Sequence, residues 1–250
     1  MNSRQIQILQ LVQENGLVDI AKLADIFDMT AQSIRRDVND LCQQGLLRRV
    51  HGGVTLPSSI ENSPYDTRNQ DNLNAKSKIG FLVAEHIPNN VSLFINIGTT
   101  TEAVARALLN HKGLTVITNN LNVAVILSKK ADFNVIIAGG SVRGKDMGVV
   151  GEATIDFIRQ FKVDFGIIGI SAIDEEGKLY DFDYREIKVS QTIIEQSKRV
   201  WLVTDNTKFG KDALAKLGSF KDIDSLFTDQ MPDKKYQAKL HAAKVTIFTP

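Results

Sequence analysis

Apolar residues recur at the spacing of an α-helix in three short segments at the beginning of the chain. The first segment, residues 4–15, ends at Gly16, and the second begins after Asp19, a residue type that favours helix N-caps. The third begins after Thr30, another favoured N-cap residue, and ends at Gly45. The apolar positions of the three segments are Ile6, Leu9, Val12, Ile20, Leu23, Ala24, Phe27, Ile34, Val38 and Leu41. This pattern predicts three consecutive helices, each with one buried face.

A β-hairpin is predicted directly after the third helix. The segment 46–56, LLRRVHGGVTL, combines strand-forming residues with a Gly52-Gly53 pair that favours a tight turn. Three short helices followed by a hairpin are typical of a winged helix-turn-helix. The sequence therefore predicts a winged helix-turn-helix domain over residues 1–56.

The composition changes over residues 57–75, which contain Pro57, Pro64, several serines and several asparagines or glutamines. The segment has little periodicity of either the helical or the strand type. These features indicate a linker or an extended arm.

Runs of β-branched and apolar residues alternate with helical segments throughout the rest of the chain. The predicted strands are 91–97, 114–118, 133–139, 165–173, 200–205 and 245–249, and the predicted helices lie near 76–87, 101–110, 120–130, 151–161, 184–197 and 235–243. Apolar strands separated by helices are typical of a mostly parallel sheet that is covered on both faces. We therefore expect a C-terminal α/β domain over residues 76–250, and an α/β fold class for the chain.

The composition is that of an ordinary globular protein. Of the 250 residues, 43% are hydrophobic and 24% are charged, which excludes a fibrous or a disordered chain. No apolar run reaches the ~18 residues of a transmembrane helix, and the N-terminus lacks the pattern of a secretory signal. The single cysteine, Cys42, leaves zinc clusters of the Cys/His type without ligands, and the histidines lack metal-like spacing. We expect a cytoplasmic protein without membrane association, metal ion or organic cofactor.

Positive charge is clustered in the first domain, although the net charge of the chain is only +1. Arginines form two adjacent pairs, Arg35-Arg36 in the third helix and Arg48-Arg49 in the hairpin. The second helix of a helix-turn-helix pair enters the major groove of DNA. The alternative is that these arginines are ordinary surface charges. We expect double-stranded DNA as a partner, contacted by Thr30, Gln32, Ser33, Arg35, Arg36, Arg48, Arg49 and His51.

A second group of candidate residues lies in turns between strands and helices. The residues Gly98, Thr99, Thr100 and Thr101 stand directly between a predicted strand and a predicted helix, where backbone N–H groups bind anions. Similar turns follow neighbouring strands at Thr118-Asn119, Gly139-Gly140 and Gly169, and ligands of parallel sheets bind in that region. The motifs GxxxxGK[ST] and GxGxxG are both missing, which argues against a nucleotide. A small phosphorylated metabolite fits these turns, and the alternative is a set of tight loops with helix caps.

Charged residues could complete such a site. Cations would neutralise the second charge of a phosphate, and carboxylates would accept hydroxyl protons from a polyol. An enzyme is the alternative, because Asp183 or Glu186 could remove a proton next to a carbonyl group. The candidate residues are Arg143, Lys145, Asp181, Asp183, Arg185, Glu186, Lys188, Asp205 and Lys208.

The chain resembles a family of bacterial regulators. The segment VDIAKLADIFDMTAQSIRRDVNDLCQQGLLRRVHGG is similar to the N-terminal signature of the DeoR-type transcriptional regulators. The segments IGTTTEAVARALLNH, TNNLNVA, GEATIDFIRQF, GISAIDEEG, DFDYREIK and DNTKFG are similar to their C-terminal sugar-phosphate sensor domain. That sensor domain shares its fold with ribose-5-phosphate isomerase and glucosamine-6-phosphate deaminase.

The resemblance implies a repressor, not an enzyme, whose affinity for operator DNA falls when a small phosphorylated metabolite binds. Glycerol 3-phosphate is the effector that the resemblance favours, with another sugar phosphate as the alternative. A scaffold that binds sugar phosphates and only docks other proteins is a third hypothesis, but it leaves the paired arginines unexplained. Because one winged helix contacts only a half-site, we expect a homodimer or homotetramer. The implied effector-binding residues are Gly98, Thr99, Thr100, Thr101, Thr118, Asn119, Gly139, Gly140, Gly169, Glu186, Lys188, Asp205 and Lys208.

Overall fold

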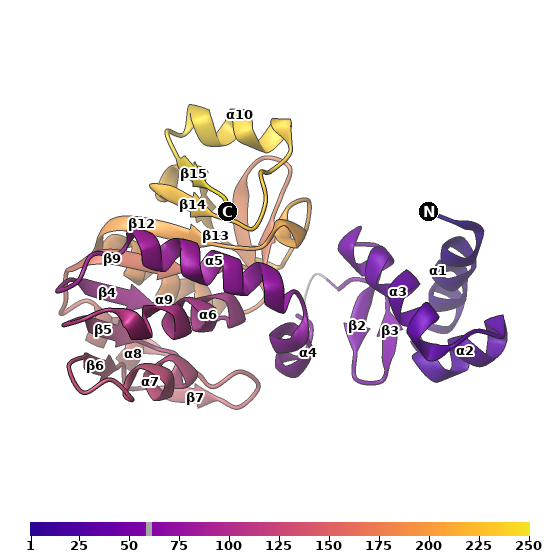
Figure 1. The fold of residues 1–250 in the computed structure, drawn as a ribbon, viewed down its shortest axis with the longest axis horizontal. Coiled ribbons are helices and arrows are strands. Elements are labelled where there is room, and N and C mark those ends of the chain that lie inside the picture. Colours follow the sequence, from indigo (N-terminus) through magenta and orange to yellow (C-terminus); the bar gives the residue numbers. More distant parts are fainter. Residues whose placement is uncertain (59–61) are drawn as a thin grey trace. The chain divides into compact units, whose positions relative to one another are not determined.

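The computed structural model describes residues 1–58 and 62–250, which form two compact units, Met1–Asp71 and Asn72–Pro250 (Figure 1). Among the described residues, one hydrophobic cluster belongs to the N-terminal unit and two belong to the C-terminal unit. Each unit therefore has a core of its own.

The N-terminal unit is a winged helix-turn-helix, as predicted. Its helices are α1 (Ser3–Asn15), α2 (Ile20–Phe27) and α3 (Ala31–Gln43). The hairpin strands β2 (Arg48–Val50) and β3 (Gly53–Thr55) follow, and β1 (Leu17–Asp19) pairs with β3 in an antiparallel sheet. The strand β1 was not predicted, because three residues are too few for a periodic pattern.

The predicted apolar stripe of α1 is partly wrong. Ile6 is 45% exposed, whereas Ile8 and Val12 are fully buried. Because Ile8 and Val12 lie four residues apart, the buried face of α1 runs through them and leaves Ile6 on the solvent side.

Local signals define the start of α3 more clearly than the start of α2. Thr30 Oγ1 accepts a hydrogen bond from the Ser33 N–H at 3.2 Å, which makes Thr30 the expected N-cap. Asp19 stands directly before α2, but in the described part of the chain its side chain makes no cap hydrogen bond.

The tight turn of the hairpin lies one residue earlier than predicted. His51 and Gly52 connect the strands, and Gly53 is already the first residue of β3. A Cβ atom on Gly53 would lie 2.7 Å from the Val18 carbonyl oxygen. Gly53 is therefore needed for the close approach of β1 to β3.

The segment predicted as a linker contains helical structure. The helix α4 (Tyr65–Gln70) lies inside it, and α5 (Leu73–His86) begins before its predicted end. Residues 59–61 of this segment lie outside the described residues. Pro64 precedes α4, a position at which a missing N–H costs little. Six residues are too few for the helical period to be recognised in the sequence.

The C-terminal unit is built on a parallel sheet of seven strands in the order β15-β14-β12-β9-β4-β5-β6. The strands are β4 (Ser92–Ile95), β5 (Thr115–Thr118), β6 (Asn134–Ile137), β9 (Val163–Ile168), β12 (Ser197–Val203), β14 (Ser225–Phe227) and β15 (Thr246–Phe248). The α/β fold class is confirmed, although β14 was missed.

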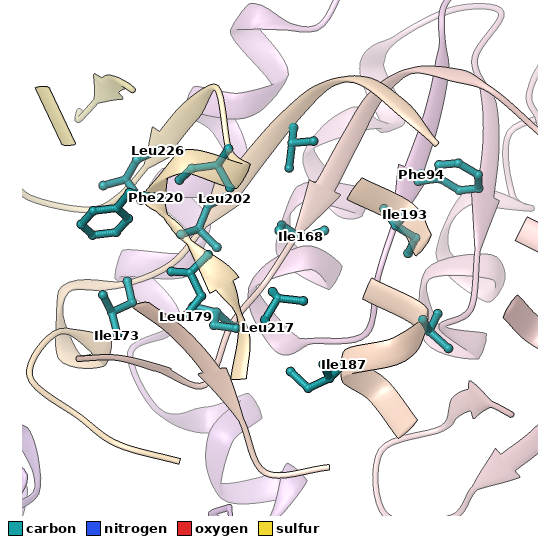
Figure 2. Close-up of a cluster of buried hydrophobic side chains, with 14 of the residues drawn as sticks. Phe94, Ile168, Ile173, Leu179, Ile187, Ile193, Leu202, Leu217, Phe220 and Leu226 are labelled. Atoms are coloured by element: carbon teal, nitrogen blue, oxygen red, sulfur yellow. The ribbon is translucent and has the colours of Figure 1, made fainter. Parts of the chain in front are cut away.

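Helices cover both faces of this sheet. They are α5, α6 (Thr99–Ala107), α7 (Leu121–Leu127), α8 (Glu152–Ile158), α9 (Tyr184–Glu195) and α10 (Lys234–Ala242). Successive strand residues point to opposite faces: Phe94 and Ile168 pack with Ile193 of α9, whereas Leu93 and Ile167 belong to the other cluster (Figure 2). Burial on both faces explains why the strands are almost continuously apolar.

Two smaller sheets were not predicted. The strands β10 (Ala172–Ile173), β11 (Lys178–Asp181) and β13 (Ala215–Ser219) form an antiparallel sheet, and β7 (Ser141–Arg143) pairs with β8 (Gly148–Val150) in a hairpin. The apolar run 165–173, predicted as one strand, is divided between β9 and β10. Across residues 1–58 and 62–250, no helix has both the length and the apolar character that crossing a membrane requires.

Candidate DNA-binding surface and anion site

The helix α3 presents a polar face to solvent. Its stripe of Ile34, Val38 and Leu41 is fully buried, which fixes the rotation of the helix. Gln32, Arg35 and Arg36 are consequently exposed, and Ser33 is half-buried. These four predicted contact residues offer an amide, a hydroxyl and two guanidinium groups on the first two turns of the helix.

Polar contacts between α1 and α3 were missed by the sequence analysis. Arg4 Nε donates to Asp37 Oδ2 at 2.6 Å, and Asn2 Nδ2 donates to Asp37 Oδ1 at 3.3 Å. Asp37 is only 4% exposed. A buried carboxylate next to the polar face of α3 ties the beginning of α1 to this helix. The position of Asp37 beside the apolar stripe of α3 was the sequence signal that could have indicated these contacts.

The two arginines of the hairpin have partners within the N-terminal unit. Arg49 Nη2 donates to Asn39 Oδ1 of α3, and Arg49 Nη1 lies 3.7 Å from Asp71 Oδ1. Arg48 Nη1 donates to the Asn62 carbonyl oxygen at 3.1 Å. His51, at the tip of the hairpin, is exposed. Of the hairpin residues predicted to contact DNA, His51 is therefore the most accessible.

The Gly-Thr turn lies at the N-terminus of α6, as the pattern predicts. Gly98 is the N-cap residue, with φ 154°, and the three threonines form the first turn. The single hydroxyl proton of Thr101 is shared between two carbonyl oxygens, that of Asn96 at 2.9 Å from Oγ1 and that of Gly98 at 2.8 Å. The Thr101 hydroxyl thus holds the turn together, and the N–H groups at the start of α6 are the candidate donors for an anion.

The predicted residues of the neighbouring strands lie at the same edge of the sheet. Ile95 of β4 is paired with Thr118 of β5 and with Ile167 of β9. Thr118 Oγ1 donates to the Ile95 carbonyl oxygen at 2.6 Å, so this hydroxyl joins two strands. The Gly169 N–H donates to Asn96 Oδ1 at 2.9 Å, which ties the turn after β9 to the turn after β4.

Asn119 and the Gly139-Gly140 pair lie next to the β7–β8 hairpin. Asn119 Nδ2 donates to the Val149 carbonyl oxygen at 2.9 Å, and its buried Oδ1 has no hydrogen-bond partner among the described residues. Gly140 has φ 151°, and a Cβ atom there would lie 2.2 Å from Thr154 Oγ1. Asn119 therefore ties the turn after β5 to β8, and the absence of a side chain at Gly140 leaves room for Thr154 of α8.

A buried cluster of charges connects this hairpin to α9. The Arg143 guanidinium bonds to Asp146 at 2.7 and 2.9 Å, to Asp183 at 2.9 Å and to Glu186 at 2.5 Å. Asp183 also accepts a hydrogen bond from the exposed Arg185 at 2.8 Å. We call Arg143, Asp146, Asp183 and Glu186 the Arg143 cluster.

The Arg143 cluster holds more negative than positive charge. Burial, followed by the negative charge of Asp181, raises the pKa of Glu186 to about 8. Burial opposes ionisation of Asp183 as well, but hydrogen bonds from Arg185 and Arg143 hold the pKa of Asp183 well below its usual range. Burial therefore favours the neutral form of Glu186, whereas the two arginines favour the ionised form of Asp183.

The Arg143 cluster lies close to the Gly-Thr turn. Ser190 of α9 accepts a hydrogen bond from Asn96 Nδ2 at 3.1 Å, and Asn96 directly precedes that turn. Glu186 stands four residues before Ser190, on the same face of α9. Lys188 is exposed on this helix, and among the described residues no side-chain hydrogen bond or ion pair joins it to the turn.

A second pair of opposite charges lies at the end of β12. Asp205 is 2% exposed and accepts hydrogen bonds from Thr207 N–H at 3.0 Å and Asn72 Nδ2 at 3.4 Å. Burial opposes its ionisation, but Lys208, Thr207 and Lys76 hold the pKa of Asp205 below its usual range. Lys76 is 5% exposed on α5. The sequence analysis missed Lys76, although a lysine three residues before Ile79 on an apolar helix face was a usable signal.

The described residues bring together no group of three or more His, Cys, Asp or Glu side chains arranged to hold a metal ion. The candidate anion site therefore combines the N-terminus of α6 with the Arg143 cluster, and the same unit also holds two lysines, Lys76 and Lys208, beside the Asp205 carboxylate. A winged helix joined to such a unit defines a DNA-binding regulator that responds to a small anionic ligand.

Comparison with known families agrees with this class. The family model described as the DeoR-like helix-turn-helix domain matches residues 4–60, and the DeoR C terminal sensor domain matches residues 71–230. The chain belongs to the DeoR family. It is a DNA-binding transcriptional repressor of this family and not an enzyme.

Curated relatives support this assignment. The chain is 50% identical over 225 residues to the glycerol-3-phosphate regulon repressor of Escherichia coli, a match that covers 90% of this chain and 89% of the relative. It is 48% identical over 230 residues to the repressor of the same name from Haemophilus influenzae, covering 92% of this chain and 90% of the relative. Among solved structures, the crystal structure of ribose 5 phosphate isomerase A from Neisseria gonorrhoeae is similar to this chain with a TM-score of 0.38 and 13% sequence identity. The match covers 54% of this chain and 52% of the isomerase chain.

Proposed function

We propose that this protein represses genes of glycerol 3-phosphate metabolism and releases its operator when glycerol 3-phosphate binds to the C-terminal unit. The observation that carries the proposal is the Gly98–Thr101 turn, an anion-binding helix N-terminus in the same chain as a winged helix. Half of the residues aligned with the Escherichia coli repressor are identical, which favours the effector in its name. Binding to chromosomal operators would place the protein in the cytoplasm.

On the DNA side, α3 enters the major groove. Gln32, Ser33, Arg35 and Arg36 contact base edges and nearby phosphates, since they occupy the exposed face of the first two turns. His51 contacts the backbone from the hairpin. Because one unit covers only a half-site, two or four copies bind a two-fold operator.

On the effector side, the phosphate binds to the N–H groups at the start of α6. Lys76, which is buried, and Lys208, which is half-buried, balance part of its charge. The hydroxyl groups of glycerol 3-phosphate point towards Asn119 and the Arg143 cluster. Carboxylates and an amide oxygen accept hydrogen bonds from hydroxyls, whereas a second phosphate would meet negative charge there.

The test is an operator titration with and without effector. Fluorescence anisotropy at fixed salt, with an operator taken from upstream of the neighbouring genes, gives the operator Kd in the presence of glycerol 3-phosphate, fructose 1-phosphate or ribose 5-phosphate. We expect glycerol 3-phosphate alone to weaken binding, by ~5–150-fold for a typical coupling of ~1–3 kcal/mol. Release by a different ester would replace the effector, and the absence of specific DNA binding would refute the proposal.

Two variants separate the DNA-binding surface from the anion site. Arg35→Ala should weaken operator binding and leave effector binding unchanged. Thr99→Asp places a carboxylate in the first turn of α6, so this variant should bind the operator but no longer respond to effector. A normal response of Thr99→Asp would place the phosphate elsewhere, and loss of both activities in Arg35→Ala would indicate unfolding.

A further inference from the structure

Arg49, a residue of the hairpin, contacts two separate parts of the N-terminal unit. Its Nη2 atom donates to Asn39 Oδ1 and lies 3.5 Å from the Arg35 carbonyl oxygen, both on α3. Its Nη1 atom lies 3.7 Å from Asp71 Oδ1, in the last residue of the unit. The guanidinium group therefore joins the hairpin, the recognition helix and the end of the connecting segment.

These contacts use the fork geometry of arginine. A guanidinium directs its donors in a fixed plane, so one side can bond to α3 while the other side faces Asp71. The Arg49 side chain is 25% exposed. A DNA phosphate that recruited Arg49 would have to compete with Asn39 and Asp71. This arrangement favours a role in holding α3 over a direct contact with phosphate.

The residue that follows Asp71 has a contact in the other unit. Asn72 belongs to the C-terminal unit, and its Nδ2 donates to Asp205 Oδ1 at 3.4 Å. Asn72 adopts the left-handed conformation, with φ 54° and ψ 33°, which only a few per cent of non-glycine residues do. One peptide bond thus separates a contact with Arg49 in the first unit from a contact with Asp205 in the second.

The charge of the buried Asp205 carboxylate is balanced by lysines. Lys208 and Lys76 both stabilise the ionised Asp205 carboxylate. An anion bound near these lysines competes with Asp205 for their positive charge and so changes the environment of the carboxylate that Asn72 contacts.

We propose that Arg49 is a positioning residue for the recognition helix, and that Asp71-Asn72 is the junction through which occupancy of the anion site changes how Arg49 holds α3. The coupling rests on the proposed function for the existence of an effector, whereas the positioning role of Arg49 does not. Effector binding weakens the Asn72–Asp205 contact and shifts Asp71, which alters the Arg49 contacts on α3.

Salt dependence of operator binding tests the role of Arg49. Loss of one phosphate contact reduces the magnitude of the slope of log K, the operator association constant, against log salt concentration by about 0.9. The full-length Arg49→Gln and Arg49→Lys variants should keep the wild-type slope, and both should bind the operator about two- to fivefold more weakly, as expected for a partly exposed polar contact. Lysine keeps the positive charge but lacks the planar set of N–H donors of the guanidinium group. A slope reduced by about 0.9 in Arg49→Gln and restored in Arg49→Lys would overturn the positioning role.

Effector response tests the junction. Asp71→Asn is isosteric and removes the charge that faces Arg49, and Asn72→Gly tolerates the left-handed conformation while removing the contact with Asp205. The operator Kd with glycerol 3-phosphate, divided by the Kd without it, should approach 1 in both variants, while calorimetry still detects effector binding. Exposed Arg159, in the C-terminal unit, provides the matched control Arg159→Gln, which should keep the wild-type ratio.

The two possible failures give different results. Wild-type ratios in both Asp71→Asn and Asn72→Gly would refute the junction while leaving the effector intact. A wild-type protein that glycerol 3-phosphate does not release would refute the proposed effector and with it the coupling, and the salt slopes of the Arg49 variants would still decide the positioning role.

Discussion

Replacing Arg143 with methionine should destabilise the C-terminal unit strongly. The Arg143 guanidinium is 8% exposed and bonds to three carboxylates, so the substitution leaves Asp146, Asp183 and Glu186 without their shared cation. Removing one partner of a buried ion pair costs ~3–5 kcal/mol. Because Arg185 still pairs with Asp183 in the variant, we expect a loss in the free energy of unfolding at the lower end of this range, about 3 kcal/mol.

The cost of Arg143→Met should depend on pH with a definite sign. The folded-state pKa of Asp183 is lowered, so its ionisation contributes stability above its unfolded pKa and loses this contribution as the pH falls. That contribution depends in part on Arg143. The variant should therefore lose most stability at neutral pH and less at about pH 3, below the ordinary aspartate pKa, where the wild type is itself losing the contribution of Asp183.

Trp201 provides the assay, because it is the single tryptophan of the chain and is 5% exposed in β12. Urea unfolding followed by its fluorescence reports on the C-terminal unit. Arg159→Met is the matched control, since Arg159 pairs with Asp156 at 3.2 Å with both side chains exposed, and it should cost at most ~0.5 kcal/mol. A loss below ~1 kcal/mol in Arg143→Met, or the same loss at both pH values, would refute the reasoning.

Two further substitutions test other parts of the structure. Glu186→Gln keeps an acceptor for Arg143 but removes a carboxyl group whose pKa is raised to about 8. A carboxyl group with a raised pKa contributes stability below its unfolded-state pKa, and this contribution is lost as the pH rises through about 8. The variant should therefore lose less stability than the wild type between about pH 5 and about pH 8.5, measured by Trp201 fluorescence in urea, and equal losses would contradict the raised pKa. Thr30→Ala removes the N-cap of α3 and should cost ~1 kcal/mol, seen as faster hydrogen exchange in the first turn of α3; unchanged exchange would show that the cap contributes nothing.

The fold was predictable where the sequence pattern is long or chemically specific. The buried strands are apolar on both faces, and the helices between them are long enough for their spacing to be recognised. Thr30 was identified as an N-cap because few residue types serve there. The strands β1, β7, β8 and β10 have two or three residues each, too few for any period, and they form only because the rest of the fold brings partners to them.

The candidate sites were predictable as sets of residues but not as sets of contacts. Strand order places Gly98, Thr118 and Gly169 at one edge because parallel strands share a direction, and this follows from the alternating pattern. The pairing of Arg143 with Asp183 and Glu186 joins residues about 40 positions apart and leaves no trace in local sequence. The contacts of Arg49 with Asn39 and Asp71 are equally non-local, and the sequence pattern could not show them.

Two of the hydroxyl groups predicted to bind the effector phosphate already donate hydrogen bonds within the fold. The hydroxyl protons of Thr101 and Thr118 are donated to main-chain carbonyls, so neither hydroxyl is free to donate to a phosphate without losing a bond that holds the turn or joins the strands. The N–H groups at the start of α6 have no intrahelical acceptors, because no helical turn precedes them. A phosphate would thus be bound mainly by the backbone. A site of this kind recognises the phosphate through the fold itself, and selects among phosphate esters through the groups around it, namely Asn119, the Arg143 cluster and the lysines beside Asp205.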